Sequence, residues 1–122
     1  MPDQAAPTVN LAVLRGVCST PPEVRRLASG RRVAALSVRT RGPGVNATSV
    51  PVSISEPAAW IEELDTGDEV VVIGLVHRRF FRTAQGTPGA RAEVEAVHVT
   101  RPTARGLAAV LRRAESALDD LV

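Results

Sequence analysis

The residues best suited to chemistry lie in one short run, Arg78-Arg79-Phe80-Phe81-Arg82. Guanidinium groups bind phosphate through a planar fork, and aromatic rings stack on nucleic-acid bases. Consecutive strand residues face opposite ways, so only one of Phe80 and Phe81 can lie on a binding face while the other packs inward. We expect Phe81 to be the stacking ring. The alternative is structural, with one ring in the core and the other in an oligomer contact.

The other reactive side chains lack partners at a useful spacing. Cys18, His77 and His98 lie far apart in the sequence, which argues against a metal site. No local motif indicates a Ser-His-Asp or Cys-His arrangement, so we expect neither catalysis nor a cofactor. The acid pairs Glu62-Glu63 and Asp68-Glu69 flank a predicted helix and turn, where solvated carboxylates are ordinary. The sequence therefore favours a binding protein over an enzyme.

Charge is unevenly distributed along the 122 residues, although the net charge is only +2. All 15 basic residues are arginine. Residues 1–55 carry seven Arg against two acids, 56–69 six acids and no Arg, 70–113 eight Arg against two acids, and 114–122 three acids. A GC-rich coding sequence would explain arginine in place of lysine, but not this segregation. The blocks therefore predict a basic surface suited to phosphate.

The compartment follows from what the sequence lacks. It has one cysteine, no signal peptide and no apolar run of 18 residues. We therefore expect a cytoplasmic protein with no membrane partner.

Alternating apolar residues predict an all-β domain. The expected strands are residues 10–17, 32–40, 48–55, 69–79 and 91–100. Pro51 cannot donate to a ladder, so its strand should lie at an edge or carry a bulge. The run Val70–Val76 is apolar on both faces, and each face should be covered by core or by another subunit. The alternation of apolar residues shifts by one position after Ala96, which predicts a β-bulge there.

Helical spacing predicts two helices. One spans residues 56–64, where Trp60 should cap the barrel rather than stack on a base, and the other is an amphipathic C-terminal helix over 103–121. Three strands, a short helix between strands three and four, and a long closing hairpin are the succession of a five-stranded OB-fold barrel. We divide the chain into a flexible leader (1–8), an OB-fold domain (9–101) and a C-terminal helix (102–122).

Several motifs carry a family resemblance over residues 9–100. They are Asn10, Gly16, Pro22-Glu23-Val24-Arg25, Ser29-Gly30, Val33-Ala34, Gly67, Gly74, Gly86 and Glu93-Val94. In this order they resemble the bacterial single-stranded DNA-binding protein family. The resemblance implies an OB-fold homotetramer that binds single-stranded DNA without sequence preference, in replication, repair or recombination. It also implies association with the nucleoid and, as a candidate partner, a larger family member.

The resemblance also implies which residues touch DNA. The family's hairpin aromatic falls on Phe81, with Phe80 beside it, whereas the other stacking positions fall near Arg39 to Arg41, on Thr48 and on Ile54, where no ring is present. We expect arginine planes to substitute for the missing rings in part. The candidate DNA-binding residues are Phe81, Phe80, Arg78, Arg79, Arg82, Arg39, Arg41, Thr48, Ile54 and Arg91.

The C-terminal segment departs from the family pattern. The long linker and acidic tip of the main family members are replaced by a predicted helix that ends in Asp119-Asp120-Leu121-Val122. We therefore interpret the chain as a shortened paralogue. The alternative is an OB-fold assembly subunit that has lost most DNA binding and acts through oligomerisation or its C-terminal helix.

Overall fold

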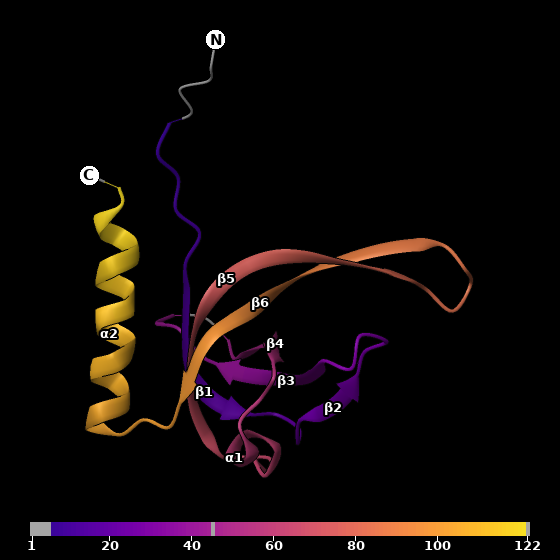
Figure 1. Ribbon diagram of the computed structural model, residues 1–122, viewed down its shortest axis with the longest axis horizontal. Coiled ribbons are helices and arrows are strands. Elements are labelled where there is room, and N and C mark those ends of the chain that lie inside the picture. Colours follow the sequence, from indigo (N-terminus) through magenta and orange to yellow (C-terminus); the bar gives the residue numbers. More distant parts are fainter. Residues whose placement is uncertain (1–5, 45, 122) are drawn as a thin grey trace.

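The computed structural model describes residues 6–44 and 46–121, which form six strands and two helices (Figure 1). The strands are β1 (Ala12–Cys18), β2 (Glu23–Arg26), β3 (Arg32–Thr40), β4 (Thr48–Ser55), β5 (Glu69–Arg82) and β6 (Pro88–Thr100). The helices are α1 (Ala59–Glu62) and α2 (Ala104–Asp119). Residues 1–5 of the predicted leader and residue 122 of the terminal segment lie outside the described part, and residues 6–8 have no regular secondary structure.

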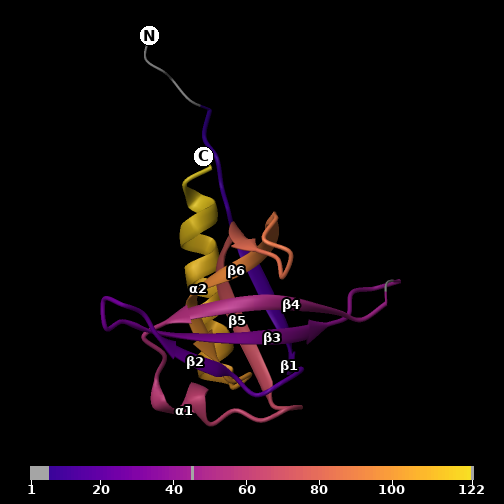
Figure 2. The same cartoon turned by 90° about the vertical axis from the view of Figure 1, so that its right-hand side faces the viewer.

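The sheet closes on itself at β1. The sheet order is β1-β5-β6-β4-β3-β2, and β1 also pairs with β3. Neighbours are antiparallel except β4 and β6, which pair in parallel through Val52–Val94 and Ser53–Glu95. Five strands therefore form a closed circuit, and β2 lies along the part of the β3 edge that β1 leaves free. In Figure 2, β3 and β4 cross β5 at a steep angle.

Strand β2 was missing from the sequence prediction, which gave five strands rather than six. Its residues, Glu23 to Arg26, are all exposed, and they pair only with β3. A strand without a buried face has no apolar alternation, so its existence depends on a neighbouring strand that a local pattern cannot show. By contrast, the predicted bounds of β3 and β4 are confirmed.

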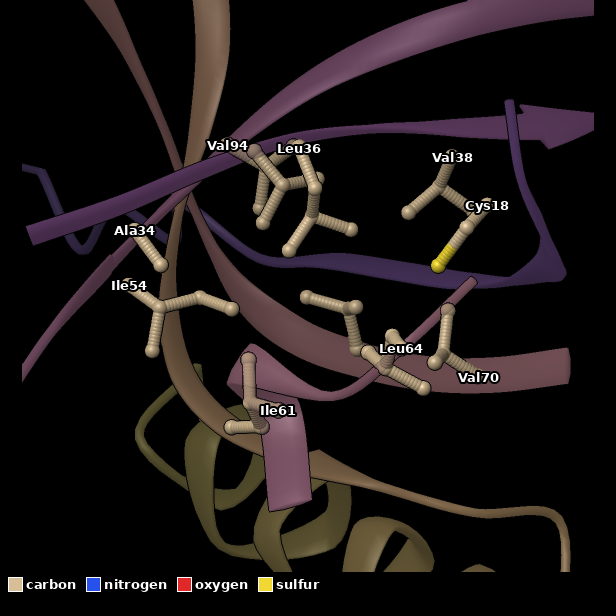
Figure 3. Packing of buried hydrophobic residues seen from close by; sticks show 11 residues of the cluster. Cys18, Ala34, Leu36, Val38, Ile54, Ile61, Leu64, Val70 and Val94 are labelled. Atoms are coloured by element: carbon tan, nitrogen blue, oxygen red, sulfur yellow. The ribbon is translucent and has the colours of Figure 1, made fainter. Parts of the chain in front are cut away.

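The core lies inside this circuit (Figure 3). Its buried residues are Cys18, Ala34, Leu36, Val38, Val52, Ile54, Ile61, Leu64, Val70, Val72 and Val94. Trp60 of α1 packs against this cluster, and the guanidinium carbon of Arg101 lies 5.0 Å from the centroid of its ring. The structural role predicted for Trp60 is therefore confirmed.

The predicted bulge is confirmed in β6. Ile73 pairs with His98 but Gly74 pairs with Ala96, which leaves Val97 as the extra residue. Gly74 allows this close approach, because a Cβ atom there would lie 2.1 Å from the backbone oxygen of Glu95.

Helix α2 covers the outer face of β5. It begins at the cap residue Thr103, whose hydroxyl accepts a hydrogen bond of 3.0 Å from the backbone N–H of Gly106. Val110 packs against Val71 and Ile73, and all three are buried. The expectation that core or another subunit covers both faces of this strand is confirmed, because Val70 and Val72 lie in the core inside the circuit and Val71 and Ile73 lie in a second core cluster with α2. A local pattern shows that a face is apolar but not which distant segment covers it.

The packing of α2 makes stability depend on pH through His98 of β6. Burial lowers the pKa of His98, and the positive charge of Arg113 lowers it further. The ordinary pKa of a histidine side chain is about 6.5, so below this pH the unfolded chain binds more protons than the folded chain. We expect the free energy of unfolding to fall as the pH drops below about 6.5. Urea unfolding at pH 7.5 and 5.5 tests this, and His98→Gln should show a smaller decline than the wild type. Equal declines in the two proteins would contradict it.

Candidate nucleic-acid interface

The run of arginine and phenylalanine lies on a long hairpin, formed by β5 and β6, that extends beyond the rest of the sheet (Figure 1). Side chains alternate between its two faces. Arg79 pairs with Arg91, and Phe81 pairs with Gly89, so these residues share one face. The other face carries Arg78, Phe80 and Arg82.

Neither phenylalanine packs in the core. The exposed fraction is 74% for Phe80 and 43% for Phe81. The prediction that one ring packs inward was wrong, because the hairpin extends past the core and both of its faces are accessible. Phe81 lies against Gly89, where an added Cβ atom would be 2.7 Å from a ring carbon. The glycine therefore makes the space that holds this ring on the hairpin.

A groove runs between the hairpin and the outer face of β2 and β3. One hollow of about 310 Å³ is lined by Glu23, Arg25, Ala35, Arg79, Phe81 and Arg91. A second hollow, of about 220 Å³, shares Glu23, Ala35, Arg79 and Arg91 with the first and reaches Ser37, Pro51 and Glu93. We call the two hollows together the hairpin groove. It brings a ring and three guanidinium groups to one concave surface.

The outer face of β3 continues from the hairpin groove toward Arg39. Ala35, Ser37 and Arg39 alternate with buried residues and so lie on the same face. Arg39 is four residues beyond Ala35, which is about 13 Å along a strand. The side chains opposite on β4 are small, with Pro51 beside Ser37 and Ser49 beside Arg39. No bulky side chain of β3 or β4 therefore stands on this face between the groove and Arg39.

Two residues of the predicted DNA-binding set have the strand phase of the inner face of β4. Ile54 is only 6% exposed and belongs to the core, so its assignment to the DNA-binding set was wrong. Thr48 is exposed, but it shares the strand phase of Val52 and Ile54 and therefore lies on the face opposite Ser49. Arg41 is exposed just after the end of β3, outside the hairpin groove. The resemblance alone could not show which face each position takes.

A buried carboxylate also lines the hairpin groove. Glu93 is 4% exposed, with its Oε2 3.7 Å from His77 Nε2 and its Oε1 3.8 Å from Arg79 Nη1. Both separations are too long for hydrogen bonds. Among the described residues, Glu93 Oε1 and His77 Nε2 have no hydrogen-bond partner. Glu93 therefore offsets part of the positive charge of the groove and attracts Arg79 toward it.

Sequence reasoning did not place Glu23, Arg25 or Glu93 in the site. Glu93 falls between inward-facing residues of its strand, a position that predicts solvent exposure. It is nevertheless buried, in the hollow that it shares with Ser37 and Pro51. Arg25 belongs to the strand that the sequence did not reveal. Its place in a motif of the family resemblance was the available signal.

Cys18 is buried in the core, and burial raises the pKa of its thiol, with Asp68 adding to this effect and Arg101 opposing it. Within residues 6–44 and 46–121, no three His, Cys, Asp or Glu side chains come together to hold a metal ion. None of the helices described is long and apolar enough to span a membrane.

The strand circuit, with a short helix between β4 and β5, is consistent with an OB-type fold. Among solved structures, the chain is similar to a deletion mutant of the single-stranded DNA binding protein from Thermus aquaticus, with a TM-score of 0.64. The sequences are 24% identical, and the match covers 78% of this chain and 42% of the other. This chain thus spans less than half the length of that protein, and the likeness shows the fold alone. No family model and no curated protein matches the chain.

Proposed function

We propose that this protein is an OB-fold barrel that binds single-stranded DNA without sequence preference in the hairpin groove. The observation that carries the proposal is the position of Phe81, which lies against Gly89 and shares the groove with Arg25, Arg79 and Arg91. A ring can stack on any base, and guanidinium groups bind the phosphates on either side. The likeness to a single-stranded DNA binding protein supports the same ligand. An accessory role in replication, repair or recombination fits this activity.

A second candidate function is an assembly subunit with little affinity for DNA. Two carboxylates, Glu23 and Glu93, line the hairpin groove, and their negative charges offset the positive charge of two of its three arginines. Only one ring, that of Phe81, lines the groove. If these features leave too little attraction for a single strand, the protein acts through contacts with other protein chains.

Titration of a labelled oligo(dT) followed by fluorescence anisotropy distinguishes the two functions. We expect saturable binding that duplex of equal length fails to compete, because a duplex cannot offer unstacked bases to Phe81. If about four phosphates are contacted, the log–log dependence of affinity on salt should have a slope of about −3. A slope near zero, or no binding at low salt, would favour the assembly subunit.

Matched arginine variants locate the binding surface. Arg91→Gln removes one charge from the hairpin groove and should make the slope shallower by about 0.7. Arg105→Gln removes one charge from the exposed side of α2 and should leave the slope unchanged. Equal effects of the two variants would mean that binding follows overall charge and not the groove.

A further inference from the structure

Helix α2 carries apolar side chains that the rest of the chain does not cover. Leu111, Leu118 and Leu121 are exposed, Leu111 by 64%. The helix repeats leucine or alanine at the alternating four- and three-residue spacing of a coiled-coil helix, at Leu107, Leu111, Ala114, Leu118 and Leu121. The sheet covers only part of this stripe, since Leu107 and Ala114 pack against the outer face of β5.

The exposed leucines lie on the side of α2 that faces β1. Arg113 is two residues from Leu111, which is about 200° around a helix, and its charge acts on His98 of β6. Strand β5 lies between β6 and β1 in the sheet, so the leucine side faces β1. Both Figure 1 and Figure 2 show the segment leading into β1 beside α2.

Strand β1 adds to the same apolar surface. Val13 pairs with Ile73, so its side chain lies on the outer face that α2 covers, and it is 49% exposed. We call Val13, Leu111, Leu118 and Leu121 the leucine strip. An apolar surface of this kind, bordered by charged residues, is typical of a protein interface.

The charges of α2 are arranged to suit a second copy of the same helix. Arg112 and Arg113 lie near its middle, and Glu115, Asp119 and Asp120 lie in its last part and at its cap. Two such helices packed antiparallel bring the basic part of each beside the acidic part of the other. With Leu111 opposite Leu118 of the second copy, Arg112 lies within one turn of Glu115 of that copy. A parallel pair would place like charges together.

We propose that the leucine strip is a homodimer interface, in which two copies of α2 pack antiparallel about a two-fold axis. The interface is isologous, because the same surface of each copy meets itself. Helix α2 and the β5–β6 hairpin lie on opposite sides of the molecule (Figure 1), so dimerisation leaves both hairpin grooves open. The dimer would then offer two grooves to one long ligand.

Sedimentation equilibrium of the full chain tests the proposal. We expect the wild type to have twice the mass of one chain and the double variant Leu111→Asp/Leu118→Asp to have the mass of one chain. Circular dichroism shows whether that variant remains folded. A wild type with the mass of one chain at all concentrations would overturn the proposal. An oligomer that survives in the folded leucine variant would do so as well.

A charge exchange tests the antiparallel orientation without altering the apolar strip. Arg112→Glu should weaken the dimer on the order of tenfold at low salt. The new carboxylate of each copy would repel Glu115 of the other, and a symmetric dimer contains this contact twice. Adding Glu115→Arg should restore the wild-type association. Arg105→Glu makes the same change of charge near the start of α2, beyond the segment that this register pairs with the second copy, and should have no effect. Failure of the exchange to restore association would overturn the orientation.

Discussion

Phe81→Ala is expected to weaken binding of oligo(dT) by about 5- to 150-fold, since stacking of one base on an aromatic ring contributes about 1–3 kcal/mol. Phe81 is the ring that shares the hairpin groove with Arg79 and Arg91, so its loss removes a contact that phosphate binding cannot replace. The salt dependence should stay unchanged, because no charge is removed. Anisotropy titrations at two or more salt concentrations measure both quantities.

Two variants make the assignment to Phe81 specific. Phe80→Ala removes an equal ring from the opposite hairpin face and should weaken binding less. Gly89→Ala keeps the Phe81 ring but places a Cβ atom 2.7 Å from one of its carbons, so the ring must move and affinity should fall. A larger loss with Phe80→Ala than with Phe81→Ala would place the stacking face on the other side of the hairpin.

The sequence predicted the parts of the fold in which burial follows a local period. The alternation of Ala34, Leu36 and Val38 gave the correct bounds of β3, and the phase slip after Ala96 located the bulge at Val97. The same reasoning failed at β2, whose residues have no buried face. It also showed that both faces of β5 needed cover without revealing that Val110, more than thirty residues away, supplies part of it.

The site was predicted in part, for a related reason. The run of arginine and phenylalanine is contiguous, so the hairpin that carries it could be recognised directly. The groove is made by strands distant in sequence, which is why Arg25 and Glu93 entered only with the structure. The assignment of Ile54 failed because a strand reverses its faces at each residue, so a family position shows a contact only where the phase is known.

The role of α2 as part of the folded domain can be tested at its buried centre. Val110→Asp places a carboxylate in the apolar contact with Val71 and Ile73. Burying a charge there and losing the packing of the valine together should lower the free energy of unfolding by at least about 3 kcal/mol. Urea unfolding followed by far-ultraviolet circular dichroism measures this loss.

The same substitution separates docking of the helix from formation of the strand circuit. The cluster around Val110 is distinct from the core inside the circuit, so α2 can detach while that core persists. Detachment would expose Val71 and Ile73 on β5, and we expect binding of the dye ANS and concentration-dependent self-association. Ser116→Asp adds the same acid to the exposed side of α2 and should change stability by no more than about 0.5 kcal/mol. If Val110→Asp were equally mild, α2 would not be docked on β5 in solution, and β5 would need another partner to cover its outer face.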